Sequence, residues 1–398
     1  MMTQKKKSYL KLVRSPGVEE IKKRIKRYRK SKFQNIITIA LPVILALFGT
    51  YLMLANHPYQ SIYRTTSYKS ETADNNQYAA FKTGIIRYNK DGVAYLNRKN
   101  EELWIHPSQF STPVLDVADN AFAVADSGGN TIQVFTRDGL KGEIETTLPI
   151  EKISVSNQGI VSVILKNEMS PVIMTYDATG NILIENQINV NNLGYPTAVE
   201  MSEDGTTLAV AYLEVNSVLM KSKVICYNFG EVGKNKQNHE VSVEEYEDAI
   251  IPELYFMGDS VLVAVSDHSF IIYEGSETPV KKKEVEISQE IKSVFHSDKY
   301  IGFIMLNKDK SGYEAKLYNK NGTLVMSRNF TGEYSNVQMY GDEIIMYSNS
   351  HCCVITDTGI LRFSGDLKAD ALLVLPAVGI NKYLVMSANE LRTVYLVK

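Results

Sequence analysis

Short apolar runs alternate with polar turns along most of the chain, from residue 84 to the C-terminus. One apolar run recurs at a mean spacing of about 44 residues between residues 120 and 382. The runs are rich in β-branched and aromatic residues and are bounded by turns such as Asp-Gly and Asn-Gly, which favours strands joined by hairpins over helices. The copies are GIIRY (from 84), NAFAVAD (120), QGIVSVIL (158), GTTLAVAYL (205), DSVLVAVSD (259), KYIGFIML (299), DEIIMYS (342) and KYLVMSA (382).

A following strand and its turn recur with the same period. The clearest copies are GVAYLNRKNEELWI (92–105), NTIQVFTRDGLKGEI (130–144), PVIMTYDATGNILI (171–184), YEAKLYNKNGTLVM (313–326) and CCVITDTGILRF (352–363). A period of this size, with four strands per unit, is typical of a β-propeller. One such sheet cannot bury its own faces, so neighbouring blades must stack around an axis.

The predicted fold is therefore all-β, a seven- or eight-bladed β-propeller. Eight copies can be assigned to the second and third strands of the unit but only seven to the first and fourth, so the strand count gives eight blades. The first blade lacks its inner strand and the last its outer one. Tyr78–Lys82 (YAAFK) is a candidate closing strand, and interleaved terminal half-blades would leave seven. A pair of β-sandwiches is the alternative fold, and it explains the regular spacing less well.

An uncharged apolar run precedes the repeats, IITIALPVILALFGTYLMLA at 36–55. Twenty residues at about 1.5 Å rise cover roughly 30 Å, the thickness of the hydrocarbon core of a bilayer. The run predicts a transmembrane helix, with Pro42 tolerated inside it. A cleaved signal peptide and a buried core helix are the alternatives. The run is long for a signal peptide, Met53 stands where cleavage after Ala55 would need a small residue, and no helical periodicity follows to pack on a core helix.

Charge is distributed very unevenly about this run. Residues 1–35 hold thirteen Lys or Arg and two acids, whereas the rest of the chain holds 30 basic and 43 acidic residues. Basic residues beside a spanning segment stay on the cytoplasmic side. We therefore expect a single-pass protein of the cell membrane with a cytoplasmic N-terminus and an extracytoplasmic propeller. The expected organisation is a basic tail (1–35), a transmembrane helix (36–55), a polar linker (56–77) and the propeller (78–398).

Within the tail, Val18, Ile21, Ile25 and Tyr28 recur at three- and four-residue spacing between basic residues. This pattern predicts a short basic amphipathic helix in the cytoplasm, suited to anionic lipid headgroups. The predicted membrane-surface residues are Lys22, Lys23, Arg24, Lys26, Arg27, Arg29 and Lys30. A pure topology signal is the alternative, and the membrane already accounts for the charge, so we expect no nucleic-acid binding.

The element SEDGTTLAVAY (202–212) resembles one frequent in WD-repeat, YVTN-type and PQQ-type propellers. The longer stretch NLGYPTAVEMSEDGTTLAVAYLEVNSVLMKSKVICYNFGEVG (192–233) is similar to a poorly characterised family of single-pass, membrane-anchored β-propeller proteins of Gram-positive bacteria. The resemblance covers tail, anchor and propeller and implies a cell-surface location, with no catalytic residue to carry over. PQQ enzymes commonly end their blades with Trp, whereas this chain has only Trp104, so we expect no cofactor.

Motifs of catalysis or metal binding are missing from the sequence. Cys226, Cys352 and Cys353 have no zinc spacing, and an adjacent pair is poor disulfide geometry, so core packing is expected. His268 and His351 precede equivalent strands, which is weak support for a metal. The segment Asn307-x-Asp309-x-Ser311-Gly312 begins like a calcium loop but has Tyr318 at the twelfth position, so a hairpin turn is favoured and no metal is predicted. The sequence contains no G-x-S-x-G nucleophile elbow, no phosphate-binding P-loop and no dinucleotide-binding motif.

The fourth repeat unit has the most distinctive chemistry. It contains an insertion at 231–248 and aromatic residues beside glycine, which are good contact material. The candidate binding residues are Tyr195, Pro196, Tyr227, Asn228 and Phe229, with gap filling in the blade as the alternative.

The predicted function is a non-enzymatic binding or scaffold module of the bacterial cell envelope, with another envelope protein or a wall polymer as partner. An envelope glycan hydrolase or lyase with its site at the propeller mouth is the alternative. Carboxylates and aromatics converging at that mouth would favour the enzyme. A sensor coupled to the tail is a third class.

Overall fold

One long helix, α1 (Val18–Ala55), precedes the strands. The computed structural model describes residues 17–55, 58–69, 75–167, 170–187, 193–215, 220–309 and 311–398. The sequence predicted a short tail helix and a separate transmembrane helix, whereas the structure joins them in one. No Gly or Pro lies between Val18 and Leu41 to end the first segment. Residues 1–16 of the predicted tail lie outside the described residues.

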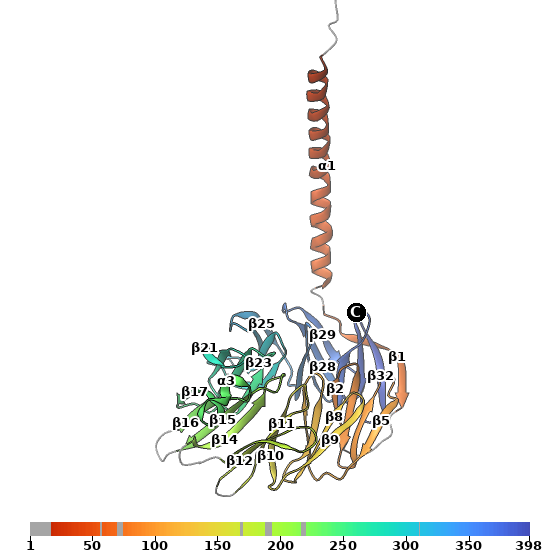
Figure 1. Cartoon of the computed structure of the whole chain (residues 1–398). Helices are drawn as coiled ribbons and strands as arrows, with labels where there is room; N and C mark the ends of the chain where they lie inside the picture. Colours follow the sequence, from red (N-terminus) through yellow and green to blue (C-terminus); the bar gives the residue numbers. More distant parts are fainter. Residues whose placement is uncertain are drawn as a thin grey trace, which may run out of the picture. The chain divides into compact units, whose positions relative to one another are not determined.

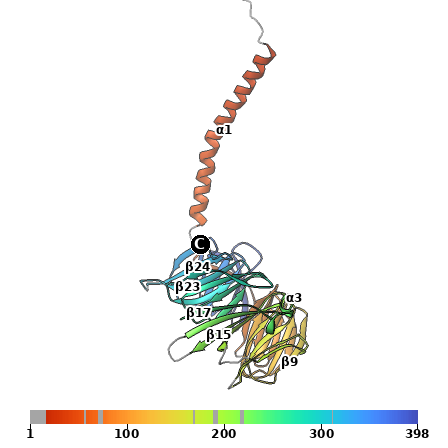
Figure 2. The same cartoon turned by 60° about the vertical axis from the view of Figure 1, so that its left-hand side comes forward.

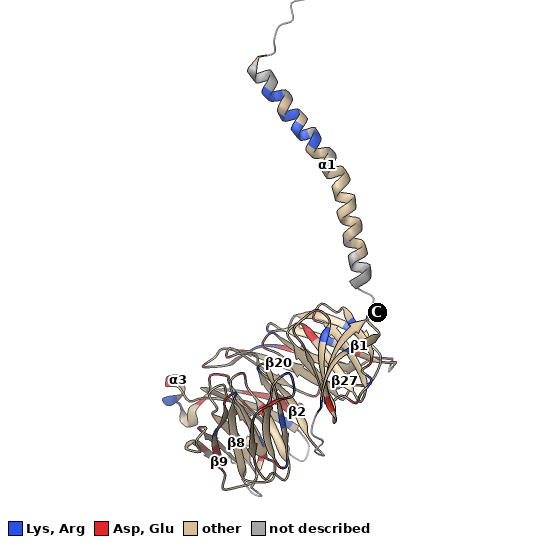
Figure 3. Ribbon diagram, turned by 90° about the vertical axis from the view of Figure 1, so that its right-hand side faces the viewer, with Lys and Arg blue, Asp and Glu red and all other residues tan. Residues whose placement is uncertain are grey.

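Within the described part of the chain, one stretch of α1 is long and apolar enough to cross a membrane, Ile25–Leu47 with 23 residues. It overlaps the predicted span at 36–55. The basic residues occupy the N-terminal half of the helix and leave the following turns uncharged (Figure 3).

The described strands form eight antiparallel sheets of four strands each. Figure 1 shows them following one another around a ring in chain order. This confirms the predicted β-propeller and settles the blade number at eight. In the first seven blades the four strands are consecutive in sequence.

The strands of blades one to four are β2 (Gln77–Phe81), β3 (Gly84–Asn89), β4 (Gly92–Leu96), β5 (Glu102–Pro107), β6 (Pro113–Val117), β7 (Phe122–Asp126), β8 (Thr131–Thr136), β9 (Gly139–Glu145), β10 (Ile150–Val155), β11 (Val161–Leu165), β12 (Val172–Tyr176), β13 (Ile182–Gln187), β14 (Tyr195–Met201), β15 (Thr207–Val215), β16 (Met220–Asn228) and β17 (Glu240–Glu247). Two short helices, α3 (Glu231–Lys234) and η1 (Gln237–His239), precede β17. The insertion expected at 231–248 thus contains the outer strand of blade four.

The strands of blades five to eight are β18 (Glu253–Phe256), β19 (Val261–Val265), β20 (Ser269–Glu274), β21 (Val280–Glu286), β22 (Ile291–His296), β23 (Tyr300–Leu306), β24 (Tyr313–Asn319), β25 (Leu324–Phe330), β26 (Asn336–Tyr340), β27 (Glu343–Ser348), β28 (His351–Thr356), β29 (Leu361–Asp366), β30 (Leu373–Pro376), β31 (Lys382–Met386), β32 (Glu390–Val397) and, last in its sheet, β1 (Ser61–Lys69).

Both ends of the repeat region close the ring. The predicted recruitment of Tyr78–Lys82 is confirmed, because β2 is the first strand of blade one. The last blade obtains its outer strand from β1, which pairs antiparallel with β32 from Ser61–Val397 to Lys69–Glu390. β1 and β32 lie side by side in Figure 1. The polar linker predicted at 56–77 therefore contains a strand, and this corrects the sequence prediction.

Apolar side chains pack between the blades. Eight clusters of buried residues occur in the described chain, and each combines residues from two neighbouring blades. The cluster that joins the last blade to the first contains Ile85 and Leu384. The one between blades seven and eight also packs against Tyr59 and Ile62 from the start of the propeller. Each sheet thus buries its faces against its neighbours, as a repeat protein requires. Figure 2 shows the ring from a second side.

Candidate functional site

A cavity of about 470 Å³ opens where the first strands of the blades end. Its walls come from the ends of seven of the eight first strands, β2, β6, β10, β14, β18, β22 and β26, and from the turns that follow several of them. Residues so far apart in sequence share one cavity only near the axis of the ring, so this is the axial mouth of the propeller. It contains the carboxyl groups of Asp116 and Glu200.

Asp116 lies on β6 and is partly buried. Its Oδ2 accepts a hydrogen bond from the backbone N–H of Val155 at 2.6 Å. Burial raises the pKa of Asp116 to about 6, although the backbone N–H groups of Val155 and Val117 oppose the shift. A carboxyl group in such a site changes its charge close to neutral pH.

Glu200 lies on β14, where its Oε2 accepts a hydrogen bond from Ser154 Oγ at 3.3 Å. The same Ser154 oxygen accepts from the N–H of Met201 at 2.9 Å. Burial raises the pKa of Glu200 well above its ordinary value, and the charge of Asp116 raises it further. Glu200 therefore keeps its proton to a higher pH than an ordinary carboxyl group does.

Further charged residues surround the mouth. Glu203 and Asp119 follow β14 and β6, and Asp298 follows β22. Burial raises the pKa of Glu203, and the charges of Asp298, Asp259 and Asp119 add to the shift. The lysines Lys82 and Lys299 lie in the same lining. Acidic groups therefore outnumber basic ones here, and their field favours a cationic ligand.

His296, at the end of β22, adds an aromatic nitrogen base to the cavity. Its ring lies 4.3 Å from the ring of Tyr255, centroid to centroid. The imidazole faces the open cavity, but the neighbouring protein atoms replace part of the water around it. This loss of solvation lowers the pKa of His296 to about 4, and the negative charge of Asp298 opposes the shift. His296 is therefore neutral at physiological pH and can accept or donate a hydrogen bond.

Asp116 also lines a second depression of about 300 Å³, together with Glu151, Glu253 and Tyr255. The predicted binding residue Tyr195 lies beside it, because its hydroxyl donates to Glu151 Oε2 at 2.6 Å. This contact and burial raise the pKa of Tyr195 to about 12, with burial the larger cause. Pro196, the next predicted residue, is buried.

Of the other predicted binding residues of the fourth unit, Tyr227 and Asn228 are packed inside the blade, whereas Phe229 is partly buried. Tyr227 is 2% exposed and hydrogen bonds with the hydroxyl of Tyr212 at 2.8 Å. Asn228 is 1% exposed and donates to Thr207 Oγ1 at 3.0 Å. Phe229 packs on the cluster between blades three and four. A partner could not touch Tyr227 or Asn228 unless the blade opened, so gap filling, the alternative interpretation, fits their positions.

The predicted membrane-surface residues all lie on α1. Six of them are exposed, and Arg24 is on the same helix. The six are Lys22, Lys23, Lys26, Arg27, Arg29 and Lys30.

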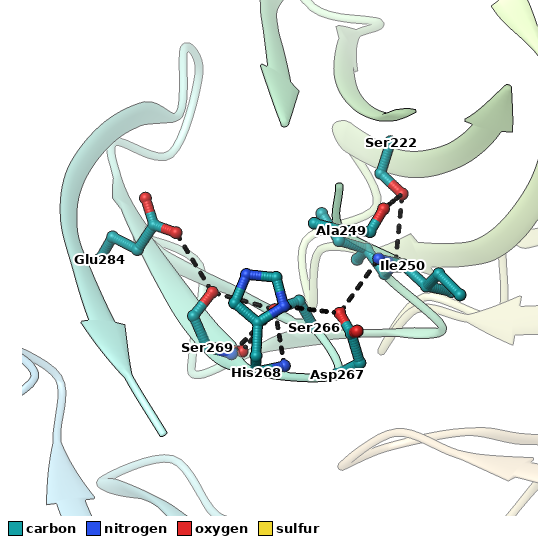
Figure 4. A network of polar contacts seen from close by, with 9 residues as sticks. Ser222, Ala249, Ile250, Ser266, Asp267, His268, Ser269 and Glu284 are labelled. Carbon is teal, nitrogen blue, oxygen red and sulfur yellow. Dashed lines mark hydrogen bonds and ion pairs between the residues drawn. The ribbon is translucent and has the colours of Figure 1, made fainter. Parts of the chain in front are cut away.

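A polar network around His268 occupies the turn between β19 and β20 (Figure 4). His268 Nδ1 lies 2.9 Å from Asp267 Oδ1, which also accepts from the N–H of Ile250 at 3.2 Å. Ser266 Oγ accepts from the N–H groups of His268 and Ser269. Asp267 and Ser266 here accept hydrogen bonds from backbone groups of the turn. In the described network, neither the Ser266 hydroxyl nor the Ser269 hydroxyl bonds to the imidazole. The arrangement therefore lacks the contact that a nucleophilic triad requires.

Among the described residues, no group of three or more His, Cys, Asp or Glu side chains is placed to hold a metal ion.

A family model matches residues 55–396, nearly the whole of the strand region. The chain belongs to DUF5711, a family of unknown function. No curated protein matches it. The family match begins at the end of α1 and covers all eight blades.

The solved structures that resemble this member of the family include BamB and Sqt1. BamB from Moraxella catarrhalis is 13% identical with a TM-score of 0.50, over 85% of this chain and 100% of that one. Sqt1 from Saccharomyces cerevisiae is 10% identical with a TM-score of 0.54, over 84% of this chain and 99% of that one. At such identities these likenesses bear on the fold alone.

Proposed function

We propose that this protein is a single-pass, membrane-anchored scaffold of the bacterial cell envelope, whose extracytoplasmic propeller binds another protein at its axial mouth. The N-terminus lies in the cytoplasm, where the basic side chains of α1 contact anionic lipid. The apolar stretch of α1 and the charge difference across it support this orientation.

The observation that carries the binding proposal is the axial cavity with its two carboxyl groups, in which the charge of Asp116 raises the pKa of Glu200. Asp116 and Glu200 lie in a partly enclosed space that is acidic at its rim. Such a space fits a lysine or arginine side chain of a partner, whose positive charge would lower the pKa of Glu200, release its proton and complete an ion pair. Because Asp116 becomes charged above about pH 6, binding should strengthen between about pH 5 and pH 7.

The test uses the full chain in crosslinked membranes, with the double substitution Asp116→Asn and Glu200→Gln. The unaltered chain should enrich a defined protein partner, and we expect the double substitution to abolish this enrichment. A chain truncated to residues 1–57, which lacks the propeller, should lose the partner too. The matched control is Asp138→Asn with Glu286→Gln, which neutralises two exposed carboxylates outside the mouth, one in the turn between β8 and β9 and one at the end of β21. If the site variant and the truncated chain capture the same proteins as the unaltered chain, the proposal is wrong.

A second function is favoured by the same pair of groups. Two carboxyl groups with different pKa values, beside an imidazole, are typical of sites for general acid–base catalysis. An envelope glycan hydrolase or lyase would use Glu200 as the protonated acid and Asp116 as the charged partner. Purified protein should then release products from cell-wall glycan, and either single substitution should abolish release while the control pair does not. Absence of products from the unaltered protein would contradict this second function.

A further inference from the structure

The turn between β30 and β31 carries two highly exposed apolar side chains. Val378 is 85% exposed and Ile380 is 84% exposed, more than any other large apolar side chain in the described chain, α1 included. Gly379 between them has φ of 127°, a conformation that glycine adopts at little cost. The turn therefore holds both side chains away from the blade, where water is their only neighbour unless something covers them.

Hydrogen bonds fix this turn beside the point where the chain enters the propeller. Asn381, which ends the turn, donates from Nδ2 to the hydroxyl of Tyr59 at 2.8 Å. The backbone N–H of Tyr59 donates to the carbonyl of Arg362 at 2.7 Å, and its carbonyl accepts from Ser364. Tyr59 is thus held by both of the last two blades.

Chain length then limits how far this turn lies from the end of α1. Tyr59 follows Ala55, the last residue of α1, by four residues. Four extended residues span at most about 14 Å, whatever the angle between helix and propeller. The headgroup layer alone is roughly 5–8 Å thick on each side of a bilayer. If the spanning stretch ends at Ala55, as the sequence predicts, Tyr59 and the turn bonded to it are within reach of the lipid surface.

The residues around the turn suit that surface. Lys398 Nζ lies 5.6 Å from the centre of the Tyr59 ring, and Lys382 Nζ lies 5.7 Å from that of Tyr395. Tyr63, which pairs with Tyr395 across β1 and β32, is 63% exposed. Tyrosine rings and lysine chains are enriched where protein meets the lipid headgroups, because each has an apolar body and a polar end.

We propose that Val378 and Ile380 insert into the headgroup layer of the bilayer that α1 spans and hold the propeller against it. The inference rests on the proposed membrane anchoring and adds a second attachment point. The occupant is lipid, because the short connection to α1 keeps the turn within reach of the membrane. An apolar tip beside tyrosine and lysine side chains is also typical of segments that bind a membrane interface.

Site-specific fluorescence quenching in lipid vesicles tests the proposal on the full chain. An environment-sensitive dye is attached to a single introduced cysteine, Val378→Cys or Ile380→Cys, and nitroxide lipids serve as quencher. The native cysteines are buried, so the dye goes to the introduced site. Leu45→Cys in α1 reports on anchoring, and Val215→Cys, 67% exposed at the end of β15, is the matched control on the propeller.

We expect nitroxide lipids to quench the dye at positions 45, 378 and 380 and to leave it bright at 215. Ile380→Ser should reduce quenching at 378, since half of the apolar tip is then lost. Quenching at 45 with bright dye at 378 and 380 would overturn the insertion while leaving the anchor intact. Bright dye at 45 would instead refute the anchor itself. A blue-shifted but unquenched dye at 378 would mean that protein covers the turn, and this also overturns the proposal.

Discussion

Arg362 should be essential to the joint between blades seven and eight. Its guanidinium pairs with the carboxylate of Glu343 and donates to Asn381 Oδ1 at 2.6 Å. Glu343 is 6% exposed, and the hydroxyl of Tyr383 lies 2.9 Å from each of its oxygens. The substitution Arg362→Leu keeps much of the apolar stem but leaves a buried carboxylate without its cation.

The size of the effect follows from burial. Removing one partner of a fully buried ion pair costs about 3–5 kcal/mol of folding free energy. The Arg362 side chain is 28% exposed, so water can replace part of its contribution and we expect a loss of about 2–3 kcal/mol. An unfolding entropy of roughly 2.1 cal/mol/K per residue over about 340 propeller residues gives roughly 0.7 kcal/mol/K, so Tm should fall by about 3–4 °C.

The loss should depend on pH. Burial raises the pKa of Glu343 above its ordinary value, while Arg362 opposes that shift. Because the folded pKa is higher than the unfolded one, the fold loses stability as pH rises from the unfolded value of about 4.5 through the folded value. Without Arg362 the folded value rises further. The deficit of Arg362→Leu should therefore be larger at about pH 7.5 than at about pH 5.

Thermal unfolding of the full chain in detergent, followed by far-ultraviolet circular dichroism, measures both effects. The double variant Arg362→Leu with Glu343→Gln should recover most of the lost stability, because a neutral amide can still accept the Tyr383 hydrogen bond. Arg137→Leu, an exposed substitution, is the control. An unchanged Tm, or the same deficit at both pH values, would refute the assignment of a buried charge to Glu343.

The three cysteines should not react with a thiol reagent at about pH 8 until the propeller unfolds, because burial raises the pKa of Cys226 and Cys353 to about 12; prompt labelling of the native chain would contradict this. Gly302→Ala in β23 places a methyl group against the ring of Phe295, so it should cost about 1–3 kcal/mol in the same melts, and an unchanged Tm would disprove that close packing. Deleting residues 1–69 leaves the last blade with three strands and should lower Tm well below that of a chain lacking only residues 1–57; equal melting would show that β1 does not close the ring.

The blades could be predicted because each repeat carries its own signal. An inner pair such as β11 and β12 is buried on both faces, so each strand is a nearly continuous apolar run that can be aligned by eye. The closing strand β1 could not be found in this way. It is an edge strand with mostly exposed side chains, and a register shift between Arg64 and Thr66 breaks its alternation. The one available signal was the missing outer strand of the last blade.

The alternative function named the propeller mouth as a place for a site, but the residues of the axial site could not be predicted, because no local pattern marks them. Asp116 and Glu200 come from different blades, and each is a single acid near the end of a first strand, a position that equally suits a solvent-facing side chain. Only the closed ring brings these strand ends together, and only the enclosure changes their pKa values. Of the candidates in the fourth unit, the sequence could not show that Tyr227 and Asn228 are buried. Aromatic residues beside glycine are as useful between blades as on a surface, and burial decides which use applies.

The two proposals constrain each other through the topology of the ring. The cavity mouth is lined by turns that join the first and second strands of their blades, including Lys82, Asp119 and Asp298. The turn that carries Val378 and Ile380 joins the first and second strands of blade eight, so it belongs to the same rim. If that turn inserts into lipid, the acidic mouth faces the bilayer. A partner must then offer its cationic side chain from the membrane surface, as a juxtamembrane segment of another membrane protein does. Detaching the turn with Val378→Ser and Ile380→Ser should accordingly weaken partner capture even though neither residue lines the cavity.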